Sequence, residues 1–489
     1  MTDEQHFRVI VIGGGPAGVT AALRSSELGA KVALVERGTL GGTCTNDGCA
    51  PTRVLAKAAR LVRDVEQFDS YGIHAAERPQ VDFSQLIART QGIIYRLHEK
   101  KQLRSHLEEA GVRVFLNAGS AHFVDEHTIE LGDGTHLTAD RFIIAAGGHG
   151  RRIPFPGSEL ALTHEDVWRL KALPKSLAIV GGAATGCQLA SIFSAFGVDV
   201  TLFEVSPRIL AREDHLVGKV VQDAFIASGI RVVTGINAIE SIEQAADGLV
   251  FHYTKDGQSH AHPAEAIILA VGWVGNIEAL NLDAAGVRSE RGYIVVDDYL
   301  RSTTPHIYAA GDITGRMMLV QSGSHEGRVA AENAVLGDGL PYKHLIVPHG
   351  GFTDPEYACV GLTEDQARKQ EPDCVVTVVN YADMDRALID DLTTGFCKLI
   401  VSQETHRILG AAVVGEQAVE VAQMIATGMA ADMWVEQLAE LELAYPTYTA
   451  IVGLAARRVV RQLGVMPLSE QWRTLGLEHA AEWERSDGG

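Results

Sequence analysis

The feature that most constrains the fold is a pattern that occurs twice along the chain. Each copy has a short apolar run, a glycine-rich turn, a helical segment, a second apolar run and a closing acidic residue; the copies span Phe7 to Glu36 and Ser176 to Glu204. In such a unit the turn joins a buried parallel strand to a helix whose N-terminus faces the phosphates of a dinucleotide. Two copies predict an α/β protein with two Rossmann-like nucleotide-binding domains, one holding its nucleotide and the other exchanging it.

The first turn carries the complete glycine fingerprint, Gly13-Gly14-Gly15-Pro16-Ala17-Gly18. Gly13 allows the tight turn, Gly15 lets a pyrophosphate approach the backbone, and Gly18 permits close packing of the helix on the sheet. Glu36, which closes the second apolar run, can accept hydrogen bonds from ribose hydroxyls. The segment therefore predicts a bound dinucleotide.

The second turn is a weaker version of the first. It reads Gly181-Gly182-Ala183-Ala184-Thr185-Gly186, so that Ala183 occupies the middle glycine position. Glu204 closes this unit, and a carboxylate there binds the free 2′-hydroxyl of NAD and repels the 2′-phosphate of NADP. Arg208 lies four residues further on, which opposes that preference. On balance the residues favour NADH over NADPH.

Two cysteines with four residues between them follow the first unit. Cys44 and Cys49 lie in the stretch from Gly41 to Arg53. A disulfide needs Cα atoms about 4.4–6.8 Å apart, whereas residues five apart on an ideal helix are about 8.5 Å apart. A bridge therefore requires an opened helical turn, which Gly48 and the preceding Asn-Asp pair favour. We interpret the pair as a redox dithiol; the alternative is two buried structural cysteines.

Length and charge narrow the class of protein. The 489 residues have room for two to four domains, and the net charge of −20 argues against a nucleic acid or an anionic membrane surface as a partner. Only one pair of the six cysteines is close in sequence, so no disulfide scaffold is implied. The N-terminus is polar and no apolar run is long enough to span a bilayer. These features predict a cytoplasmic protein without a membrane partner.

The segment Gly-Gly-Thr-Cys-x-Asn-x-Gly-Cys-x-Pro, from Gly41 to Pro51, resembles the active-site motif of the FAD-dependent pyridine nucleotide–disulfide oxidoreductases. This family includes dihydrolipoamide dehydrogenase, glutathione reductase and mercuric reductase, and the resemblance extends to about residue 465. It implies an FAD-binding domain (1–155, with a return segment at 276–345), an NAD(P)-binding domain (156–275) and a C-terminal α+β dimerisation domain (346–470) that makes a homodimer. A charged tail, 471–489, follows.

The resemblance also implies roles for individual residues. Cys49 faces the flavin and Cys44 meets the acceptor, while Asp312 accepts a hydrogen bond from the ribitol chain. No metal site is expected. The residues implied to bind FAD or NAD(H) are Gly13, Gly15, Gly18, Glu36, Gly42, Thr43, Arg53, Ala121, Ala146, Gly147, Gly181, Gly186, Gln188, Glu204, Gly272 and Asp312.

One departure from the family lies next to the expected flavin. The family usually has Ser-Lys where this chain has Thr52-Arg53, and a glutamate that pairs with the lysine is Gln188 here. The exchange keeps one positive charge near the flavin but removes its counter-charge. We hypothesise that Arg53 thereby strengthens the electrostatic support for an anionic reduced flavin.

A second departure concerns proton transfer. Disulfide reductases of the family end with His-Pro-Thr-x-x-Glu, in which the histidine carries the thiol proton; here Tyr445 and Ala450 occupy the His and Glu positions. A tyrosine, with an ordinary pKa of about 10, is a poor base near neutral pH. We expect Tyr445 from the other chain to donate a hydrogen bond to the acceptor or to a thiolate, and turnover of dihydrolipoamide or glutathione disulfide to be slow.

Three functions remain open at this stage. Mercuric reductase also has tyrosine at this position, and thiolates are soft ligands for a metal ion. Against a mercuric-reductase-like function, this chain has no cysteine pair after Cys397 to hand over the metal. The second hypothesis is a dihydrolipoamide or other disulfide reductase with a relocated base. The third is a slow flavoprotein subunit or redox sensor. Three classes of acceptor stay open: a metal ion, a quinone and a disulfide.

Overall fold

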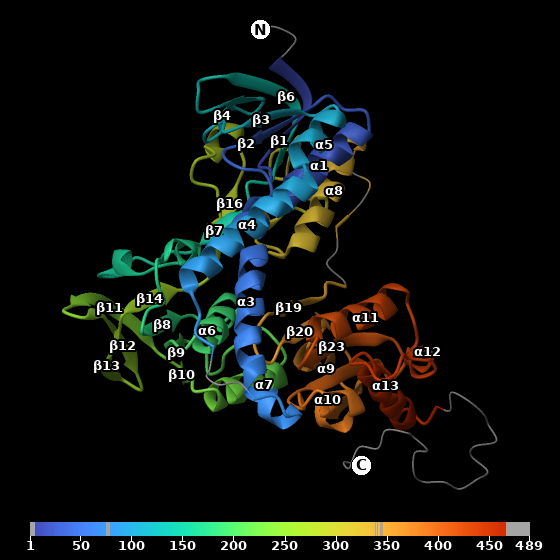
Figure 1. Ribbon diagram of the computed structural model, residues 1–489. Coiled ribbons are helices and arrows are strands. Elements are labelled where there is room, and N and C mark those ends of the chain that lie inside the picture. The colour runs from blue at the N-terminus through green and yellow to red at the C-terminus, as the bar shows by residue number, and fades with distance from the viewer. Residues whose placement is uncertain (1–4, 75–78, 338, 340, 343–345, 466–489) are drawn as a thin grey trace.

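The computed structural model describes most of the chain, namely residues 5–74, 79–337, 339, 341–342 and 346–465. Figure 1 shows three parts, each built on its own sheet. The chain passes from the first part to the second, returns to the first and then enters the third (Figure 1). The predicted tail, 471–489, lies outside the described residues, and the predicted domain boundaries stay predictions.

The first part is a mixed sheet with its longest strand at the centre. The strand order is β3-β2-β1-β6-β5-β4, with β18 also paired to β6. The pairs β1–β2, β1–β6, β2–β3 and β6–β18 are parallel, as a nucleotide-binding unit requires. Helices α1 and α8 pack against each other beside this sheet. The bounds are β1 (His6–Ile12), α1 (Pro16–Glu27), β2 (Val32–Glu36), β3 (Arg113–Leu116), β4 (His122–Asp125), β5 (Thr128–Glu130), β6 (His136–Ile144), β18 (Ile307–Ala309) and α8 (Val320–Leu336).

The second part repeats the same design in four parallel strands. Its order is β10-β9-β8-β14, and a three-stranded antiparallel sheet, β11-β12-β13, covers one side. A short antiparallel pair, β7–β15, lies where the chain crosses between the first two parts. The bounds are β7 (Gly148–Gly150), β8 (Ser176–Val180), α6 (Ala184–Ala195), β9 (Asp199–Glu204), α7 (His215–Ala227), β10 (Arg231–Thr234), β11 (Ala238–Ala245), β12 (Gly248–Lys255), β13 (Gln258–Ala264), β14 (Ala266–Leu269) and β15 (Trp273–Gly275).

The third part is an antiparallel sheet covered by helices. Its order is β19-β20-β23-β22-β21, and β22 and β23 form a long antiparallel pair near its centre. Helices α11 and α13 close a hydrophobic core over the sheet. The bounds are β19 (His349–Gly351), β20 (Tyr357–Gly361), α9 (Glu364–Gln370), β21 (Val375–Asn380), α10 (Asp385–Ile389), β22 (Phe396–Val401), β23 (Ile408–Val414), α11 (Ala418–Ala430), α12 (Val435–Ala439) and α13 (Ala450–Gln462).

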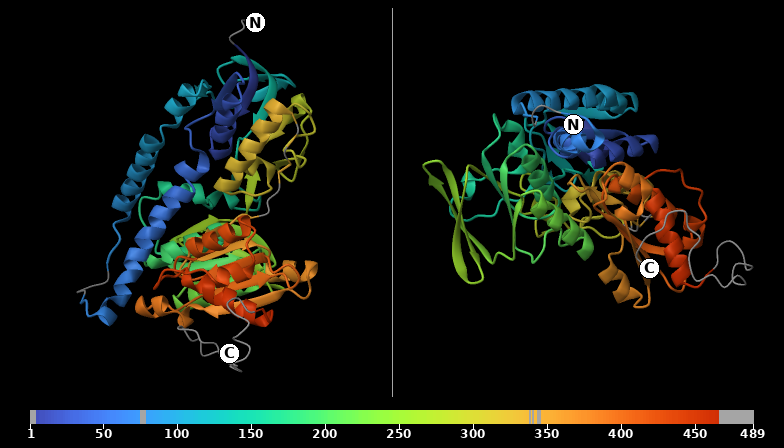
Figure 2. Two further views of the ribbon diagram at one scale, coloured as in Figure 1. Left: turned by 90° about the vertical axis from the view of Figure 1, so that its right-hand side faces the viewer. Right: turned by 60° about the horizontal axis from the view of Figure 1, so that its bottom comes forward.

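Long helices after the first unit connect the three parts. Helix α3 (Cys49–Asp64) buries Leu55, Ala56 and Ala59 in a hydrophobic cluster that it shares with α6 of the second part and β20 of the third. Figures 1 and 2 show α3 and the neighbouring α4 (Phe83–Lys101) running lengthwise along the molecule. The middle of α3 is therefore packed against both the second and the third part. Among the helices of the described residues, none has the length and apolar character needed to cross a membrane.

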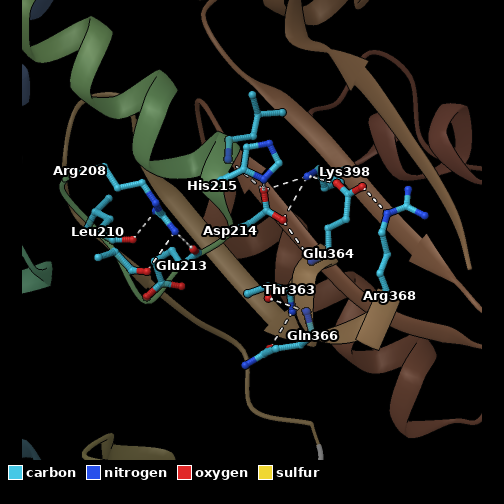
Figure 3. Close-up of polar contacts among 12 residues, drawn as sticks. Arg208, Leu210, Glu213, Asp214, His215, Thr363, Glu364, Gln366, Arg368 and Lys398 are labelled. Carbon is cyan, nitrogen blue, oxygen red and sulfur yellow. Dashed lines mark hydrogen bonds and ion pairs between the residues drawn. The ribbon is translucent and has the colours of Figure 1, made fainter. Parts of the chain in front are cut away.

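A buried ion cluster joins the second and third parts (Figure 3). Lys398 on β22, whose side chain is 2% exposed, donates to both carboxylate oxygens of Asp214 at 2.9 and 3.1 Å and to Glu364 at 2.7 Å. Asp214 also caps α7 by accepting from the Leu216 amide. Burial opposes ionisation of Asp214, but the hydrogen bonds from Lys398 and the amide outweigh it and lower the pKa of this carboxyl.

We expect Lys398→Met to lower the free energy of unfolding by about 3–5 kcal/mol, because it leaves the buried carboxylate of Asp214 without its cation, whereas Glu364 keeps its ion pair with Arg368. The lowered pKa of Asp214 means that the cluster stabilises the fold above the unfolded pKa, about 3.9, and that this stabilisation is lost as the pH falls through the folded value. Urea unfolding at neutral pH measures the change, with Lys369→Met, an exposed lysine on α9, as control. Equal stability of the two variants would contradict the assignment.

Candidate active site

The first glycine turn has the geometry that the fingerprint predicts. Gly13 has φ +107°, and a Cβ on it would lie 2.3 Å from the Ala145 carbonyl oxygen. A Cβ on Gly18 would lie 1.8 Å from the Gly13 oxygen, so only glycine fits where α1 packs under the turn. Gly15 faces open space, with no atom nearer than the Gly42 Cα at 3.7 Å from a built Cβ. A phosphate can therefore approach the backbone at Gly15.

The second turn has the same geometry although its middle residue is alanine. Gly181 has φ +114°. A Cβ on Gly186 would lie 1.8 Å from the Gly181 carbonyl oxygen, so only glycine fits there. Ala183 precedes α6 with φ −85° and ψ −172°, close to the −75° and −175° of Gly15. This extended conformation suits any residue. The middle position therefore tolerates a methyl group, and the second unit is as well formed as the first.

The acidic residues that close the two units bind their own glycine turns. Glu36 accepts from the Gly14 amide at 2.7 Å and from the Gly38 amide at 2.8 Å. Glu204 accepts in the same way from the Gly182 amide at 2.6 Å and from the Ser206 amide at 2.7 Å. Both carboxylates are thus fixed at the rim of a nucleotide site, where each can receive a ribose hydroxyl.

A single cleft of about 2470 Å³ joins both turns and the cysteine pair. A smaller cavity of about 70 Å³ lies beside the large cleft. Glu36 and Ala146 line both, and Ala121 lines the smaller one. Gly18 and Gly186 are buried behind the turns that they support. The predicted residues that line the large cleft are Gly13, Gly15, Glu36, Gly42, Thr43, Cys44, Cys49, Ala146, Gly147, Gly181, Gln188, Glu204, Gly272 and Asp312.

The helix is interrupted between the two cysteines, as a bridge between them requires. Cys44 belongs to the short helix α2 (Gly42–Asn46), and α3 begins at Cys49. The Gly48 amide donates to the Thr43 carbonyl at 2.6 Å, and a Cβ on Gly48 would lie 2.9 Å from the same oxygen. Both cysteines are free thiols, and their side chains are hydrogen bonded to each other. The alternative of two buried structural cysteines is not met, because Cys49 is exposed to the cleft.

The two thiols differ in acidity. The hydrogen bond from the Cys44 thiol stabilises the Cys49 thiolate and, against the effect of burial, lowers the pKa of Cys49 to about 7. The same hydrogen bond, followed by burial, raises the pKa of Cys44. The pair therefore ionises first at Cys49, and the second proton stays between the two sulfurs.

Helix α4 supplies two side chains to this site that sequence reasoning missed. Lys101 donates to the Thr45 hydroxyl at 2.9 Å, and its charge lowers the pKa of Cys44 in opposition to the stronger effects above. His98 is hydrogen bonded to the Asn46 side chain at 2.8 Å. Both hold the segment between the cysteines. No local sequence pattern indicates this role, because both residues are more than fifty positions from the cysteine segment along the chain.

Asp312 lines the cleft and follows β18 along the chain. Burial raises the pKa of its carboxyl to about 6, and the charge of Glu326 acts in the same direction. Glu326 accepts from the Gly311 amide at 2.6 Å, which fixes the turn before Asp312. The carboxyl is therefore well placed to take part in a hydrogen bond with a polyol chain in the cleft.

The prediction that Arg53 lacks a counter-charge is wrong. Its guanidinium donates to Glu356 at 2.7 Å and lies over the Phe352 ring, 4.4 Å from the centroid. Gln188, the expected partner position, instead donates to the Ala184 carbonyl and accepts from the Phe352 amide. Arg53 is also absent from the described lining of the cleft. The ion pair with Glu356 joins α3 to the third part and neutralises the Arg53 charge. The structure therefore does not support the hypothesis that an unpaired Arg53 tunes the flavin.

Tyr445 is not brought to the cleft of its own chain. Its side chain is exposed, and its hydroxyl donates to Asp385 on α10. Because a phenol has one proton, donation to an acceptor across a dimer requires this hydrogen bond to break. The role of Tyr445 opposite a second chain stays a prediction.

The residues of the cleft fit FAD. Gly15 leaves the backbone open, and no side chain of the described residues caps α1, so its first amides are free to face a pyrophosphate. The smaller cavity beside Ala121 lies next to Glu36, where the adenosine end of such a nucleotide belongs. Two nucleotide sites and a cysteine pair in one cleft define a class of protein: flavoprotein oxidoreductases that take electrons from a pyridine nucleotide.

Comparison with known proteins identifies the family. The family model described as "Pyridine nucleotide-disulphide oxidoreductase" matches residues 7–327, and the model of that family's dimerisation domain matches residues 347–456. The chain belongs to the class I pyridine nucleotide-disulphide oxidoreductases. It is an FAD-dependent oxidoreductase that uses a pyridine nucleotide.

Individual relatives fall into two groups by name. The mercuric reductase of Bacillus cereus is 33% identical over 460 residues, which cover 93% of this chain and 72% of that protein. The dihydrolipoyl dehydrogenase of Zymomonas mobilis is 32% identical over 454 residues, covering 90% and 95%. A solved structure, the HOCl-induced flavoprotein disulfide reductase RclA from Escherichia coli, matches with a TM-score of 0.81 and 26% identity, covering 92% of this chain and all of that one.

Proposed function

We propose that this enzyme passes electrons from NADH through the Cys44–Cys49 pair to a soft metal ion. The observation that carries the proposal is a cysteine pair open to the cleft in a chain whose acid–base positions hold Tyr445 and Ala450. The Tyr445 proton is already donated to Asp385 within the chain. An acceptor that needs no proton from the enzyme suits such a site.

Two thiolates meet that requirement for a metal ion. When Cys44 and Cys49 form a disulfide, the pair releases two electrons and two protons. A Hg²⁺ ion bound by the sulfurs takes both electrons and leaves as the neutral atom, whereas two Cu²⁺ ions take one electron each and leave as Cu⁺. Soft ions prefer thiolate ligands, and neither product has to be protonated. Bound FAD supplies the transfer of electrons from the nicotinamide to the sulfur pair.

The relatives support this choice of acceptor. Several similar proteins bear the name mercuric reductase, and a Cu(II) complex of a mutant of RclA has been solved that matches this chain with a TM-score of 0.82 at 26% identity. The dihydrolipoyl dehydrogenases are similar to the same degree. The alternative is therefore a disulfide acceptor, and the experiment must distinguish it from a metal-ion acceptor.

An acceptor panel tests the proposal. NADH oxidation by the purified holoenzyme is measured with Hg²⁺, Cu²⁺, lipoamide and glutathione disulfide. We expect kcat/KM for at least one metal ion to exceed that for either disulfide by about 10²-fold or more. This is the usual loss of rate when an enzyme lacks a general acid–base group. Faster turnover of lipoamide at neutral pH selects the dihydrolipoamide alternative. Absence of any acceptor faster than oxygen selects the slow flavoprotein.

The acidity of Cys49 gives a prediction about the reduced enzyme. After reduction by one equivalent of NADH, the long-wavelength absorption of a thiolate beside the flavin should grow as the pH rises, with a midpoint near 7. This lies well below the ordinary thiol value of 9.0 because the Cys44 thiol donates to the thiolate. Cys44→Ala removes that donor, and the midpoint should then move upward. A midpoint that does not move would show that Cys44 has no part in the shift.

The preference for NADH rests on two side chains. Glu204 presents a carboxylate where the 2′-phosphate of NADPH would lie. Arg208, which could have bound that phosphate, donates instead to the carbonyls of Leu210, Ala211 and Glu213 at 2.8–3.0 Å. Because like charges brought together cost several kcal/mol, we expect kcat/KM for NADH to exceed that for NADPH by about 10²-fold. Steady-state kinetics with both nucleotides measure the ratio.

The working unit that we propose is a homodimer. The third part matches the family's dimerisation domain, and it exposes the apolar side chains of Leu388, Ile389 and Tyr445 on and near α10. A face of this kind is typical of a surface that a second chain covers. The cytoplasmic location predicted from the sequence stays a prediction.

A further inference from the structure

Three donor side chains from three separate elements converge beside the nucleotide cleft. They are Glu213, just before α7, His349 on β19 and Cys359 on β20. One ligand atom from each lies within 4.8 Å of the other two, and His349 Nε2 lies 3.1 Å from Glu213 Oε2. The Cys359 side chain is also hydrogen bonded to Glu213.

These separations are close to what a tetrahedral ion requires, and His349 and Glu213, at 3.1 Å, would move slightly apart to bind one. Zinc–ligand bonds of about 2.0–2.3 Å place neighbouring donors about 3.3–3.8 Å apart. A set of one thiolate, one imidazole and one carboxylate is typical of Zn²⁺ and related ions rather than of Mg²⁺ or Ca²⁺. Three protein ligands leave the fourth position for water, and Glu213 and His349 both line the cleft, so an ion can enter.

The donors are held in place before any ion arrives. His349 and Cys359 are directly opposite each other in the β19–β20 register, which brings their side chains to the same face. His349 Nδ1 is hydrogen bonded to the Val347 carbonyl at 3.2 Å, which leaves Nε2 as the nitrogen that can bind a metal. The three hydrogen bonds from Arg208 to carbonyls fix the loop that carries Glu213 (Figure 3).

Glu213 interacts electrostatically with both of the other donors. Burial, together with the charge of Glu213, raises the pKa of the Cys359 thiol. Burial opposes the charge on His349, but Glu213 outweighs it and raises the pKa of that imidazole.

We propose that Glu213, His349 and Cys359 bind one divalent cation of the zinc type at the edge of the nucleotide cleft. The site is separate from Cys44 and Cys49 and does not depend on which acceptor they reduce. Because Glu213 belongs to the second part and the other two ligands to the third, a bound ion links the two parts.

Zinc binding to the FAD-loaded holoprotein tests this site. The protein carries Cys44→Ser and Cys49→Ser, so that the redox pair cannot bind the ion. Equilibrium dialysis with Zn²⁺ and elemental analysis should give one ion per chain. Co²⁺ should bind in the same ratio, with a thiolate-to-cobalt absorption in the difference spectrum.

Single substitutions in this background assign the ligands. Cys359→Ala and His349→Gln should each weaken Zn²⁺ binding by about tenfold or more, and Cys359→Ala should remove the cobalt–thiolate absorption. Cys397→Ala is the matched control, because it empties a fully buried thiol position in the same sheet and should leave binding unchanged. If Cys359→Ala does not fold, His349→Gln, at a half-buried position, decides alone. Failure of the parent protein to bind zinc, or zinc binding by both variants as tight as that of the parent protein, would overturn the proposal.

Discussion

Replacing either cysteine of the pair with serine should lower acceptor turnover by about 10⁴-fold or more, the scale seen when an enzyme loses its nucleophile. Both sulfurs line the cleft and are hydrogen bonded to each other, so neither alone can cycle between dithiol and disulfide. The two variants should differ in one respect. Cys49→Ser should lose the long-wavelength absorption of the reduced enzyme, whereas Cys44→Ser should keep it, because we propose that Cys49 faces the flavin.

Kinetics and spectra of the same preparations check this prediction. Cys187→Ser is a suitable control, because this thiol is buried on α6 outside the lining of the cleft. Full turnover by both redox-pair variants would mean that electrons reach the acceptor without passing through sulfur.

Gly18→Ala should produce protein that binds FAD about 10- to 100-fold more weakly or fails to retain it. A Cβ there would lie 1.8 Å from the Gly13 backbone oxygen, so the turn that faces the phosphates must open. Overpacking against fixed atoms costs about 1–3 kcal/mol, and backbone cannot move aside as a flexible side chain can. Flavin absorbance per chain after gel filtration measures retention.

Gly92→Ala is the matched control for that substitution. Gly92 lies within α4, and a built Cβ meets no atom within 4 Å. Alanine is the better helix former by about 1 kcal/mol, so this variant should keep its flavin and gain a little stability. Full FAD content in Gly18→Ala would contradict the role of glycine in the first turn.

The parts of the site that local rules govern could be predicted from the sequence. The positive φ of Gly13 and Gly181 and the interrupted helix between the cysteines follow from residues that are neighbours along the chain. The prediction that Ala183 weakens the second turn is wrong. Its position has an extended backbone, which alanine adopts as readily as glycine.

The parts that depend on contacts between distant segments could not be predicted. Arg53 pairs with Glu356, which lies more than three hundred residues away, directly before β20 of the third part. Lys101 reaches the redox segment from a helix that no motif connects to it. The Glu213, His349 and Cys359 cluster combines a loop with two paired strands, and no spacing in the sequence marks it as a metal site. Such partners are set by packing, which single-sequence patterns do not encode.

Anaerobic titration of the purified holoenzyme with NADH tests the central claim most directly. We predict that the first equivalent opens the Cys44–Cys49 disulfide, so that a long-wavelength absorption appears while the flavin stays largely oxidised, and that two new thiols react with an alkylating reagent. Bleaching of the flavin by the first equivalent, with no such absorption and no gain of reactive thiols, would contradict it.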